Sequence, residues 1–221
     1  YSDDPDDDSG YTAAEFWGIL YYGKERDYFK IGDQVKIACS TTKFSDTEIV
    51  LELRSFKHFM SAERTDQFAG PYFGMIGLMA SNRTMHSSDT NSGGFPATTM
   101  FTALGSSYFE GLPLFWKGII EKIIVLSSAG DQSEGIVRGE THLTLESQAE
   151  VGFNTTTAPY CNEVAEGADE VTFSCYTDNT SRIKKTYNGT GSAGNYWLRS
   201  PLSSSTTNFC AVNNNGNANG N

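Results

Sequence analysis

The sequence predicts an α+β fold with two short helices, antiparallel sheets and a loop-rich C-terminal half. Helical spacing of apolar residues occurs early in the chain, and segments that alternate with period two lie on both sides of the helices. The last third is rich in Thr, Asn, Gly and Ser, which is typical of loops and short strands. A chain of 221 residues with 38% hydrophobic content can bury one core. We therefore expect one domain at residues 11–221, preceded by an acidic linker or tail at residues 1–10.

The first helix is predicted by its start and stop signals. Thr12 and Glu15 have the spacing of a capping box, in which each residue accepts a hydrogen bond from the other's backbone. Apolar residues then recur at helical spacing over residues 16–20, and Gly23 supplies a stop. These signals predict a short amphipathic helix.

Alternation replaces helical spacing after this helix. Residues 28–37 alternate around a Gly32-Asp33 turn, and residues 49–54 alternate again, so both segments are predicted to be sheet strands with one wetter face. The run Asn91-Ser92-Gly93-Gly94 has turn chemistry rather than the pattern of a phosphate-binding loop.

The middle of the chain predicts two more helices and two buried strands. Residues 97–104 and 113–122 have helical character, the second starting with a proline at a position where helices tolerate it. Residues 123–126 and 141–145 resemble buried strands. Beyond residue 152, we expect loops and two short strands, at residues 195–201 and 209–212.

Charge and hydropathy exclude two classes of partner. The net charge of −11 argues against nucleic acid, because phosphate binding requires a basic excess. Five of the 27 acidic residues fall within residues 3–8, which lack the turn glycine and closing acid of a calcium loop. No stretch reaches 18 consecutive apolar residues, so no membrane insertion is expected.

No residue pattern in the chain predicts catalysis, a metal or a cofactor. The three histidines, His58, His86 and His142, lie in unrelated contexts, and the common catalytic motifs are missing from the sequence. The four cysteines lack the spacing of zinc or redox sites. Cys161 and Cys175 either bridge a loop or remain buried thiols. We expect a protein that is not an enzyme.

The C-terminal end has the strongest compositional anomaly. Seven of the 14 residues from Asn208 to Asn221 are asparagine, with apolar residues such as Phe209 and Val212 interleaved among them. One interpretation is a disordered low-complexity end. The alternative is a fixed scaffold that alternates with a polar recognition surface, since asparagine carries both donors and an acceptor on a short side chain.

Several segments together resemble one family. They are residues 28–33 (YFKIGD), residues 88–94 (SDTNSGG) followed by Met100, Leu112-Pro113, and above all residues 196–201 (YWLRSP) followed by Phe209, Val212 and Gly216. This set resembles the C-type-lectin-fold variable proteins of diversity-generating retroelements and the bacterial and phage domain family around them. The resemblance covers about residues 11–221, and YWLRSP is its most specific part.

The resemblance implies a C-type lectin-like fold and a recognition module whose C-terminal region, residues 195–221, is rewritten at template adenines by error-prone reverse transcription. Asparagine codons are adenine-rich, which would account for the anomaly. The residues implied to be variable and to face the ligand are Asn195, Tyr196, Thr206, Thr207, Asn208, Asn213, Asn214, Asn215, Asn217, Asn219 and Asn221. The residues implied to form the scaffold are Trp197, Leu198, Arg199, Phe209, Cys210, Val212 and Gly216.

On this basis we expect a non-enzymatic ligand-recognition or adhesion module outside the cell, displayed on a bacterial surface or a phage virion. Its partner would be a protein or a surface ligand, and the sequence allows an oligomer without locating its interface. Calcium-dependent sugar binding is not implied, because the sugar-binding triplets of animal C-type lectins are missing from the sequence. The alternatives are an enzyme of the formylglycine-generating type on the same fold, and a structural fibre or assembly domain.

Overall fold

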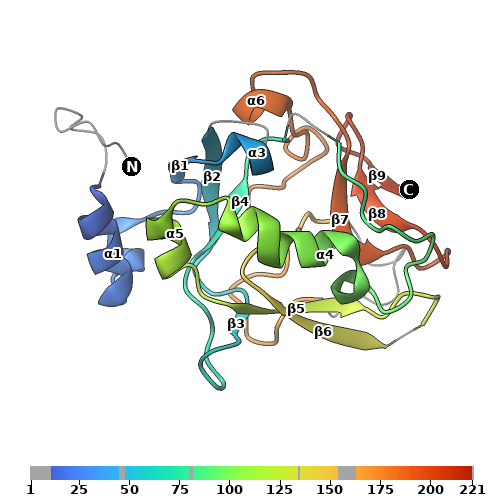
Figure 1. The fold of residues 1–221 in the computed structure, drawn as a ribbon, viewed down its shortest axis with the longest axis horizontal. Coiled ribbons are helices and arrows are strands. Elements are labelled where there is room, and N and C mark those ends of the chain that lie inside the picture. Colours follow the sequence, from blue (N-terminus) through green and yellow to red (C-terminus); the bar gives the residue numbers. More distant parts are fainter. Residues whose placement is uncertain (1–10, 45–47, 80–81, 134, 154–162, 221) are drawn as a thin grey trace.

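The computed structural model describes residues 11–44, 48–79, 82–133, 135–153 and 163–220. These residues form short helices around three small antiparallel sheets, so the α+β class with antiparallel sheets is confirmed (Figure 1). The predicted acidic segment, residues 1–10, lies outside the described residues. Among the helices that are described, none combines the length and the apolar character needed to cross a bilayer.

The elements are short and are joined by long loops. The helices are α1 (Ala13–Tyr21), α2 (Glu25–Tyr28), α3 (Thr41–Phe44), α4 (Thr99–Ala103), α5 (Leu114–Ile119) and α6 (Thr186–Gly189), with a 3-10 turn at Phe95–Ala97 and a π-helical turn at Leu104–Tyr108. The strands are β1 (Gln34–Ala38), β2 (Glu48–Ser55), β3 (Met60–Ser61), β4 (Tyr72–Met75), β5 (Ile123–Ser128), β6 (Ile136–Thr141), β7 (Tyr196–Pro201), β8 (Phe209–Val212) and β9 (Ala218–Gly220).

Each sheet has three strands, in the orders β1-β2-β4, β3-β5-β6 and β7-β8-β9. In the first sheet Val35 of β1 pairs with Leu51 of β2. In the third sheet β8 is the central strand: Val212 pairs with Tyr196 of β7 and with Ala218 of β9. In this sheet, which carries most of the asparagine-rich end, β8 is therefore hydrogen-bonded to a strand on each side.

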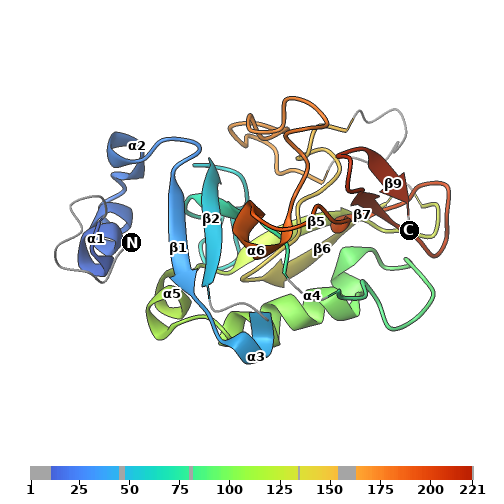
Figure 2. The same cartoon turned by 90° about the horizontal axis from the view of Figure 1, so that it is seen from above.

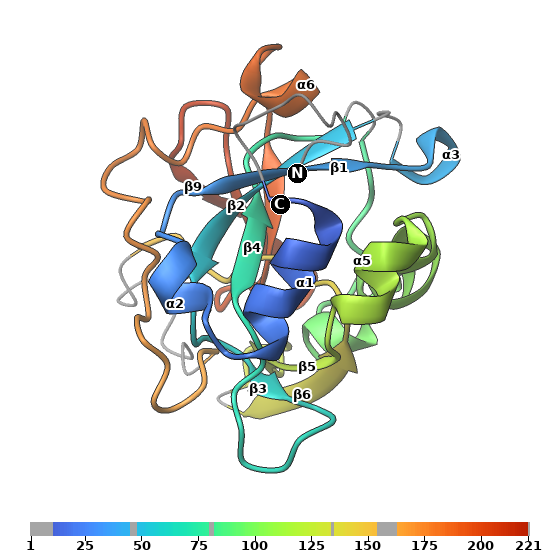
Figure 3. The same cartoon turned by 90° about the vertical axis from the view of Figure 1, so that its left-hand side faces the viewer.

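The first hydrophobic core lies between α1, α5 and the β1-β2-β4 sheet, and Figure 3 shows α1 in front of β2 and β4 with α5 beside it. Phe16 packs against Trp116 of α5, with ring centroids 5.4 Å apart. The predicted capping box is present at the start of α1, where Thr12 and Glu15 accept from each other's backbone amides. This prediction is confirmed.

Two further cores support the second and third sheets. One surrounds Phe95 and Val125 and includes Phe209 of β8. The other joins Leu198, Cys210 and Val212 to aromatic residues from the preceding loops, among them Phe173 and Tyr176. In Figures 1 and 2, α1 and the third sheet lie at opposite ends of the molecule. The C-terminal strands are therefore anchored far from the N-terminal helices.

The prediction of a strand before the Gly32-Asp33 turn is wrong. Tyr28 ends α2, and residues 29–33 form a turn rather than a strand. Asp33 causes this, because its carboxylate accepts from the backbone amide of Lys30 at 2.8 Å and its own amide donates to the Lys30 carbonyl at 3.0 Å. The second half of the prediction is confirmed as β1, whose partner is β2.

The predicted buried strand at 141–145 is also wrong. The strand is β6 (Ile136–Thr141), which lies at the edge of its sheet and is mostly exposed or half-buried. It ends where the Thr141 hydroxyl donates to the Leu143 carbonyl at 2.9 Å. Gly139 within β6 leaves space for Phe101, because a Cβ there would lie 2.6 Å from the Phe101 ring. Because Gly139 interrupts the run of larger side chains in β6, the sequence pattern did not indicate a strand there.

The remaining predicted elements are present with shifted bounds. The first of the two later helices is α4, which starts two residues later than expected because Thr98 caps it and accepts from the Phe101 amide. The second is α5, and Pro113 directly precedes it. The strands predicted at residues 49–54, 123–126, 195–201 and 209–212 correspond to β2, β5, β7 and β8. The disordered interpretation of the end does not hold for residues 209–220, which form β8, a turn and β9.

Candidate ligand-recognition face

Most of the residues predicted to face a ligand fall into two groups at opposite ends of β8, whereas Asn219 lies on β9 opposite Ala211 of β8. Asn195 and the residues of the β8–β9 turn, 213–217, lie at one end. Thr206, Thr207 and Asn208 lie at the other, in the β7–β8 loop of residues 202–208. Asn208 and Asn213 are separated by the length of β8, about 16 Å at ~3.3 Å per residue. The structure therefore presents two patches rather than one continuous surface. The first patch is Asn195 with residues 213–217, and the second is Thr206, Thr207 and Asn208.

Exposure divides the predicted positions further. The exposed positions are Asn195, Thr206, Asn214, Asn215 and Asn217. The half-buried positions are Tyr196, Thr207, Asn208, Asn213 and Asn219. Asn221 lies outside the described residues.

Asn213 holds the β8–β9 turn in shape. Its side-chain oxygen accepts from the backbone amides of Asn215 at 2.9 Å and Asn217 at 3.0 Å. Its backbone amide donates to the Asn217 carbonyl, and its carbonyl accepts from Gly216, both at 2.9 Å. This pattern is an Asx turn, in which the short side chain mimics a backbone turn. Asn213 is consequently a structural residue of this patch.

The turn is fixed against the loop that contains Asn179. Gly216 has φ +77°, and a Cβ on it would lie 1.7 Å from the Asn179 carbonyl oxygen. The Asn179 side chain donates to the Asn217 side-chain oxygen at 2.6 Å. On the other side, the Asn195 side chain accepts from the Asn214 amide at 3.0 Å. The tip of the patch, Asn214 and Asn215, is held by its backbone amides, so both side chains can change without loss of these contacts.

The position of the second patch, Thr206, Thr207 and Asn208, depends on Asn91. The sequence predicted a turn at Asn91 and no further role. Asn91 is buried, and its side-chain amide donates to the carbonyls of Ser205 at 2.9 Å and Asn208 at 2.8 Å. Its side-chain oxygen accepts from the Asp131 amide at 2.7 Å, and its backbone amide donates to Thr206. One asparagine thus connects three loops and sets the position of residues 202–208.

The residues implied to form the scaffold are buried or pack against the core. Leu198, Arg199 and Val212 are fully buried, and Phe209 nearly so. Trp197 is half-buried, and its indole N–H donates to the Arg83 carbonyl at 2.9 Å. Tyr196, which the resemblance assigned to the variable set, has a structural contact too. Its hydroxyl donates to the Arg182 carbonyl at 2.9 Å, and its ring lies under the Lys184 ammonium group at 4.8 Å.

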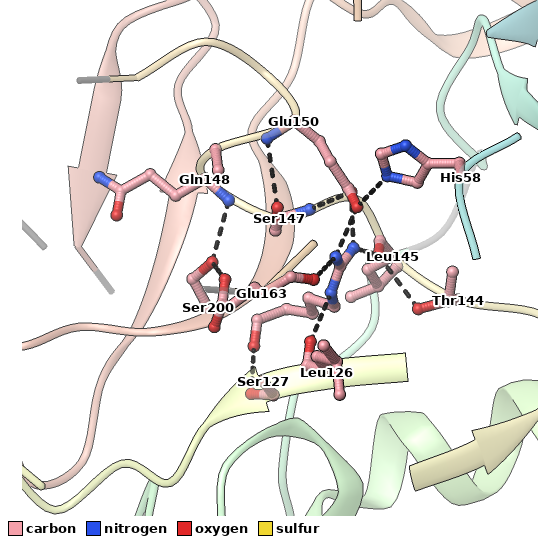
Figure 4. Close-up of polar contacts among 12 residues, drawn as sticks. His58, Leu126, Ser127, Thr144, Leu145, Ser147, Gln148, Glu150, Glu163 and Ser200 are labelled. Carbon is pink, nitrogen blue, oxygen red and sulfur yellow. Dashed lines mark hydrogen bonds and ion pairs between the residues drawn. The ribbon is translucent and has the colours of Figure 1, made fainter. Parts of the chain in front are cut away.

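Arg199 of the YWLRSP segment is buried and is bonded to a polar network. Figure 4 labels other members of this network, among them His58, Glu150, Glu163 and Ser200. The guanidinium group of Arg199 donates to both carboxylate oxygens of Glu150, at 2.6 and 2.5 Å. It also donates to the backbone carbonyls of Leu126, Leu145 and Glu163. A fully buried charge requires this degree of pairing, because an unsatisfied one would be very costly. Arg199 therefore binds β5, β7 and two loops into one unit.

His58 reaches the same network from the N-terminal half. Its Nε2 lies 2.7 Å from Glu150, and it is enclosed by Phe59, Tyr72 and Phe173. Burial by itself would raise the pKa of Glu150, but the charges and hydrogen bonds of Arg199 and His58 outweigh it and lower that pKa. Glu150 is thus an anion at neutral pH, as its role as acceptor requires.

A second buried carboxylate, Glu163, has the opposite shift. Burial raises its pKa, although Arg199, Ser200 and Ser128 partly offset this effect. Glu163 accepts from the hydroxyl of Ser200 and from the amide of Ser128 at 2.8 Å. The Ser200 hydroxyl in turn accepts from the Gln148 amide at 2.9 Å. All of these groups are buried, so the network is suited to stability rather than to substrate contact.

A small polar hollow of about 250 Å³ lies beside β2. Below it the buried Glu146 accepts from Lys184 at 2.9 Å and from the Tyr176 hydroxyl at 2.8 Å. Arg54 donates to Glu52 at 2.6 Å. The lining residues are Glu52, Arg54, Ile76, Cys175, Tyr176, Ser181, Ile183 and Lys184. Two cations and two carboxylates meet here, so the hollow has no net charge that would select an ionic ligand.

The cysteines and histidines within the described residues form no catalytic arrangement. Cys175 is a free thiol, and burial raises its pKa to about 11, which leaves little thiolate at neutral pH. Cys161, the other half of the pair considered from the sequence, lies outside the described residues. His142 stacks on Phe109 with centroids 4.0 Å apart. No group of three or more His, Cys, Asp or Glu residues suited to a metal occurs in the described part of the chain.

Comparison with known protein families gives one match. The model of a family described as a domain of unknown function, DUF6273, matches residues 78–221, which is more than half of the chain. The chain belongs to the DUF6273 family. Neither the curated proteins nor the solved structures give a match. The DUF6273 region contains both patches, Asn91 and most of the Arg199 network, whereas His58 and Arg54 reach it from the preceding segment.

The polar residues that sequence reasoning missed are Asn91, His58 and the three buried glutamates, Glu146, Glu150 and Glu163. Glutamate is rarely buried without a partner, so a Glu within an otherwise uncharged stretch, such as Ser147-Gln148-Ala149-Glu150-Val151, was an available signal. The partners of these residues could not be read from the sequence, because Glu150 and Arg199 are 49 residues apart.

Proposed function

We propose that the chain is a non-enzymatic ligand-recognition module whose C-terminal end presents a diversifiable binding surface. The observation that carries this proposal is the division of residues 195–220 into buried and exposed positions. Leu198, Arg199, Phe209, Cys210 and Val212 are buried in the cores or the polar network. Asn195, Asn214, Asn215 and Asn217, at one end of β8, and Thr206, at the other end, are exposed. A scaffold of this kind keeps its shape while the exposed residues change.

The proposal includes a C-type lectin-like fold and a retroelement variable protein, on the strength of the resemblance described above. It also includes display on a bacterial surface or a phage virion, with a protein or surface ligand as partner. Tyrosine and tryptophan make the strongest anchors in a paratope. Because the exposed positions here are asparagine and threonine, we infer that this sequence binds weakly compared with relatives that carry aromatic residues there.

The geometry refines which positions belong to the surface. Asn214 and Asn215 are exposed at one patch and Thr206 at the other. Asn195 is exposed too, but its side chain accepts from the Asn214 amide and helps to hold the turn. Asn213 is excluded from the variable set on physical grounds, because its side chain holds the turn. Tyr196 is excluded for the same reason, since its hydroxyl donates to the Arg182 carbonyl. The contact of Asn208 with Asn91 uses the Asn208 backbone carbonyl, so it does not exclude the Asn208 side chain from the variable set.

Two libraries of the displayed chain test this proposal. The first randomises the exposed positions Thr206, Asn214 and Asn215, and the second randomises Leu198, Asn213 and Val212. Both are selected against several unrelated purified proteins. We expect folded binders from the first library and mostly unfolded chains from the second.

Sequencing of the gene locus in sister strains tests the mechanism of diversification. We expect an adjacent reverse transcriptase, a near-identical repeat that differs at adenines, and substitutions concentrated at the exposed positions. Exposed asparagines no more variable than Leu198 or Pro201, or a first library without binders, would refute the proposal.

A further inference from the structure

The end of the molecule opposite the C-terminal patches has an apolar groove between α1 and α5. The groove has a volume of about 550 Å³. Its lining residues are Ala13, Ala14, Trp17, Leu114, Phe115, Gly118 and Ile119. None of these carries a charge. The first core lies beneath the groove, so the lining is the outer side of helices that are already well packed.

Large apolar side chains extend the groove into a wider exposed face. Leu114 is 82% exposed on one wall and Trp17 is 45% exposed on the other. Trp17 stacks on Tyr21, with centroids 4.6 Å apart, and Tyr21 contacts Tyr22 edge to face at 5.2 Å. Tyr21 and Tyr22 are 66% and 73% exposed. These residues are therefore contiguous, unlike the singly scattered apolar residues of an ordinary surface.

The exposed aromatic side chains of this face supply about half or more of the area that one partner contributes to a small protein interface. Aromatic side chains offer about 150–250 Å² each, so the exposed fractions of Trp17, Tyr21 and Tyr22 amount to roughly 300–450 Å². Leu114 and the groove walls add to this value. A specific interface requires about 600 Å² or more from each partner, and contiguous apolar patches larger than a few hundred Å² mark interaction sites on soluble proteins.

We propose that this face is the interface of a homodimer, in which the α1–α5 face of one copy packs against the same face of a second copy. The uncharged lining favours this occupant, because like charges do not oppose each other when an uncharged face meets its own copy. The face also has both a groove and protruding residues, Leu114 and Tyr21, as a two-fold interface requires. In Figures 1 and 2, α1 lies at the far end from β8 and β9, so this contact leaves both C-terminal patches uncovered.

Sedimentation velocity of the 221-residue chain at micromolar concentrations tests the proposal. We expect a reversible monomer–dimer equilibrium. Each chain carries a net charge of −11, so repulsion between copies weakens the dimer at low ionic strength, and added salt strengthens it. Trp17 becomes less exposed in the dimer, so acrylamide quenching of tryptophan fluorescence decreases as the protein concentration rises.

Substitution of Leu114 locates the interface. Leu114→Glu places a charge on both halves of a two-fold contact, and we expect it to abolish the dimer while the melting temperature of the monomer stays the same, because Leu114 is mostly exposed. Val171→Glu is the matched control, since Val171 is 56% exposed on a loop outside the groove lining, and this variant should still dimerise. A wild-type chain that stays monomeric at every concentration and salt level would overturn the proposal, as would a dimer that Leu114→Glu leaves intact. Either result would indicate that a different protein or another segment covers the groove.

Discussion

Replacement of Glu150 by glutamine tests whether the buried network stabilises the fold. The carboxylate of Glu150 accepts four hydrogen bonds, two from Arg199 at 2.6 and 2.5 Å, one from His58 at 2.7 Å and one from the Ser147 amide at 2.7 Å. Glutamine has nearly the same volume but one oxygen fewer and no charge. At least one donor and the full charge of Arg199 would then be left uncompensated in the interior.

The expected cost follows from the complete burial of both partners. Loss of one member of a buried ion pair destabilises a protein by about 3–5 kcal/mol, which is a large part of a total stability of about 5–15 kcal/mol. At roughly 2–4 °C per kcal/mol for a chain of this size, we expect Glu150→Gln to lower the melting temperature by about 6–20 °C. Urea denaturation followed by circular dichroism measures the free energy.

Glu140→Gln is the matched control, because Glu140 forms exposed ion pairs with Lys122 and Arg138. Such pairs contribute at most about 1 kcal/mol. If Glu150→Gln is too unstable to purify, the double variant Glu150→Leu with Arg199→Met removes both charges and should be more stable than Glu150→Gln alone. A loss below about 1 kcal/mol in Glu150→Gln, at an unchanged urea dependence, would refute the assigned role of the network.

The same carboxylate also predicts a pH dependence. Its pKa in the folded protein is lowered to about 2, below the ordinary value of 4.5, so its contribution to stability is complete above pH 4.5 and is lost as the pH falls through the folded-state pKa. Glu150→Gln should therefore lose stability less steeply than the wild type as the pH falls below about 4.5. Parallel pH profiles for the two proteins would contradict this result.

Two further substitutions test what shapes the candidate patches. Asn91→Ala removes the contacts that connect three loops, and we expect the unfolding free energy to fall by about 1–3 kcal/mol. Amide hydrogen exchange in residues 202–208 should become faster. Exchange at the wild-type rate would exclude Asn91 as the residue that fixes the position of that loop. Gly216→Ala forces a Cβ to within 1.7 Å of the Asn179 carbonyl at a positive φ, so we expect a loss above about 1 kcal/mol, whereas Asn214→Ala should stay within about 0.5 kcal/mol of wild type. Equal unfolding free energies for these last two variants would show that the turn is not docked as described.

Whether a helix or strand could be predicted from the sequence depended on whether contacts close in the sequence or distant contacts determine it. The capping box at Thr12 and Glu15 was found in the sequence because both partners lie within one turn of the helix. β1 was found because its burial alternates with the period of a strand, and β8 was found because a short apolar run lies between polar residues. The strand predicted before Gly32 was wrong because Asp33 bonds to the backbone of Lys30 and turns the chain. The shift from residues 141–145 to β6 has a tertiary cause, the approach of Phe101 to Gly139.

The sequence by itself determined the α+β class, the helices α1, α4 and α5, and the strands β1, β2, β5, β7 and β8. It also determined the alternation of apolar residues with asparagines, on which the proposed recognition surface rests. These features depend on the period of side chains along the chain and on contacts over three or four residues. Only the tertiary structure decided that the asparagines divide into two patches, that Asn213 and Asn91 are structural, and that Arg199 is bound to Glu150 in the interior. The physical reason is that each of these facts depends on which side chains meet across the cores. A buried charge or amide must find partners wherever the fold brings them, and in this protein the main partner of Arg199 is 49 residues away.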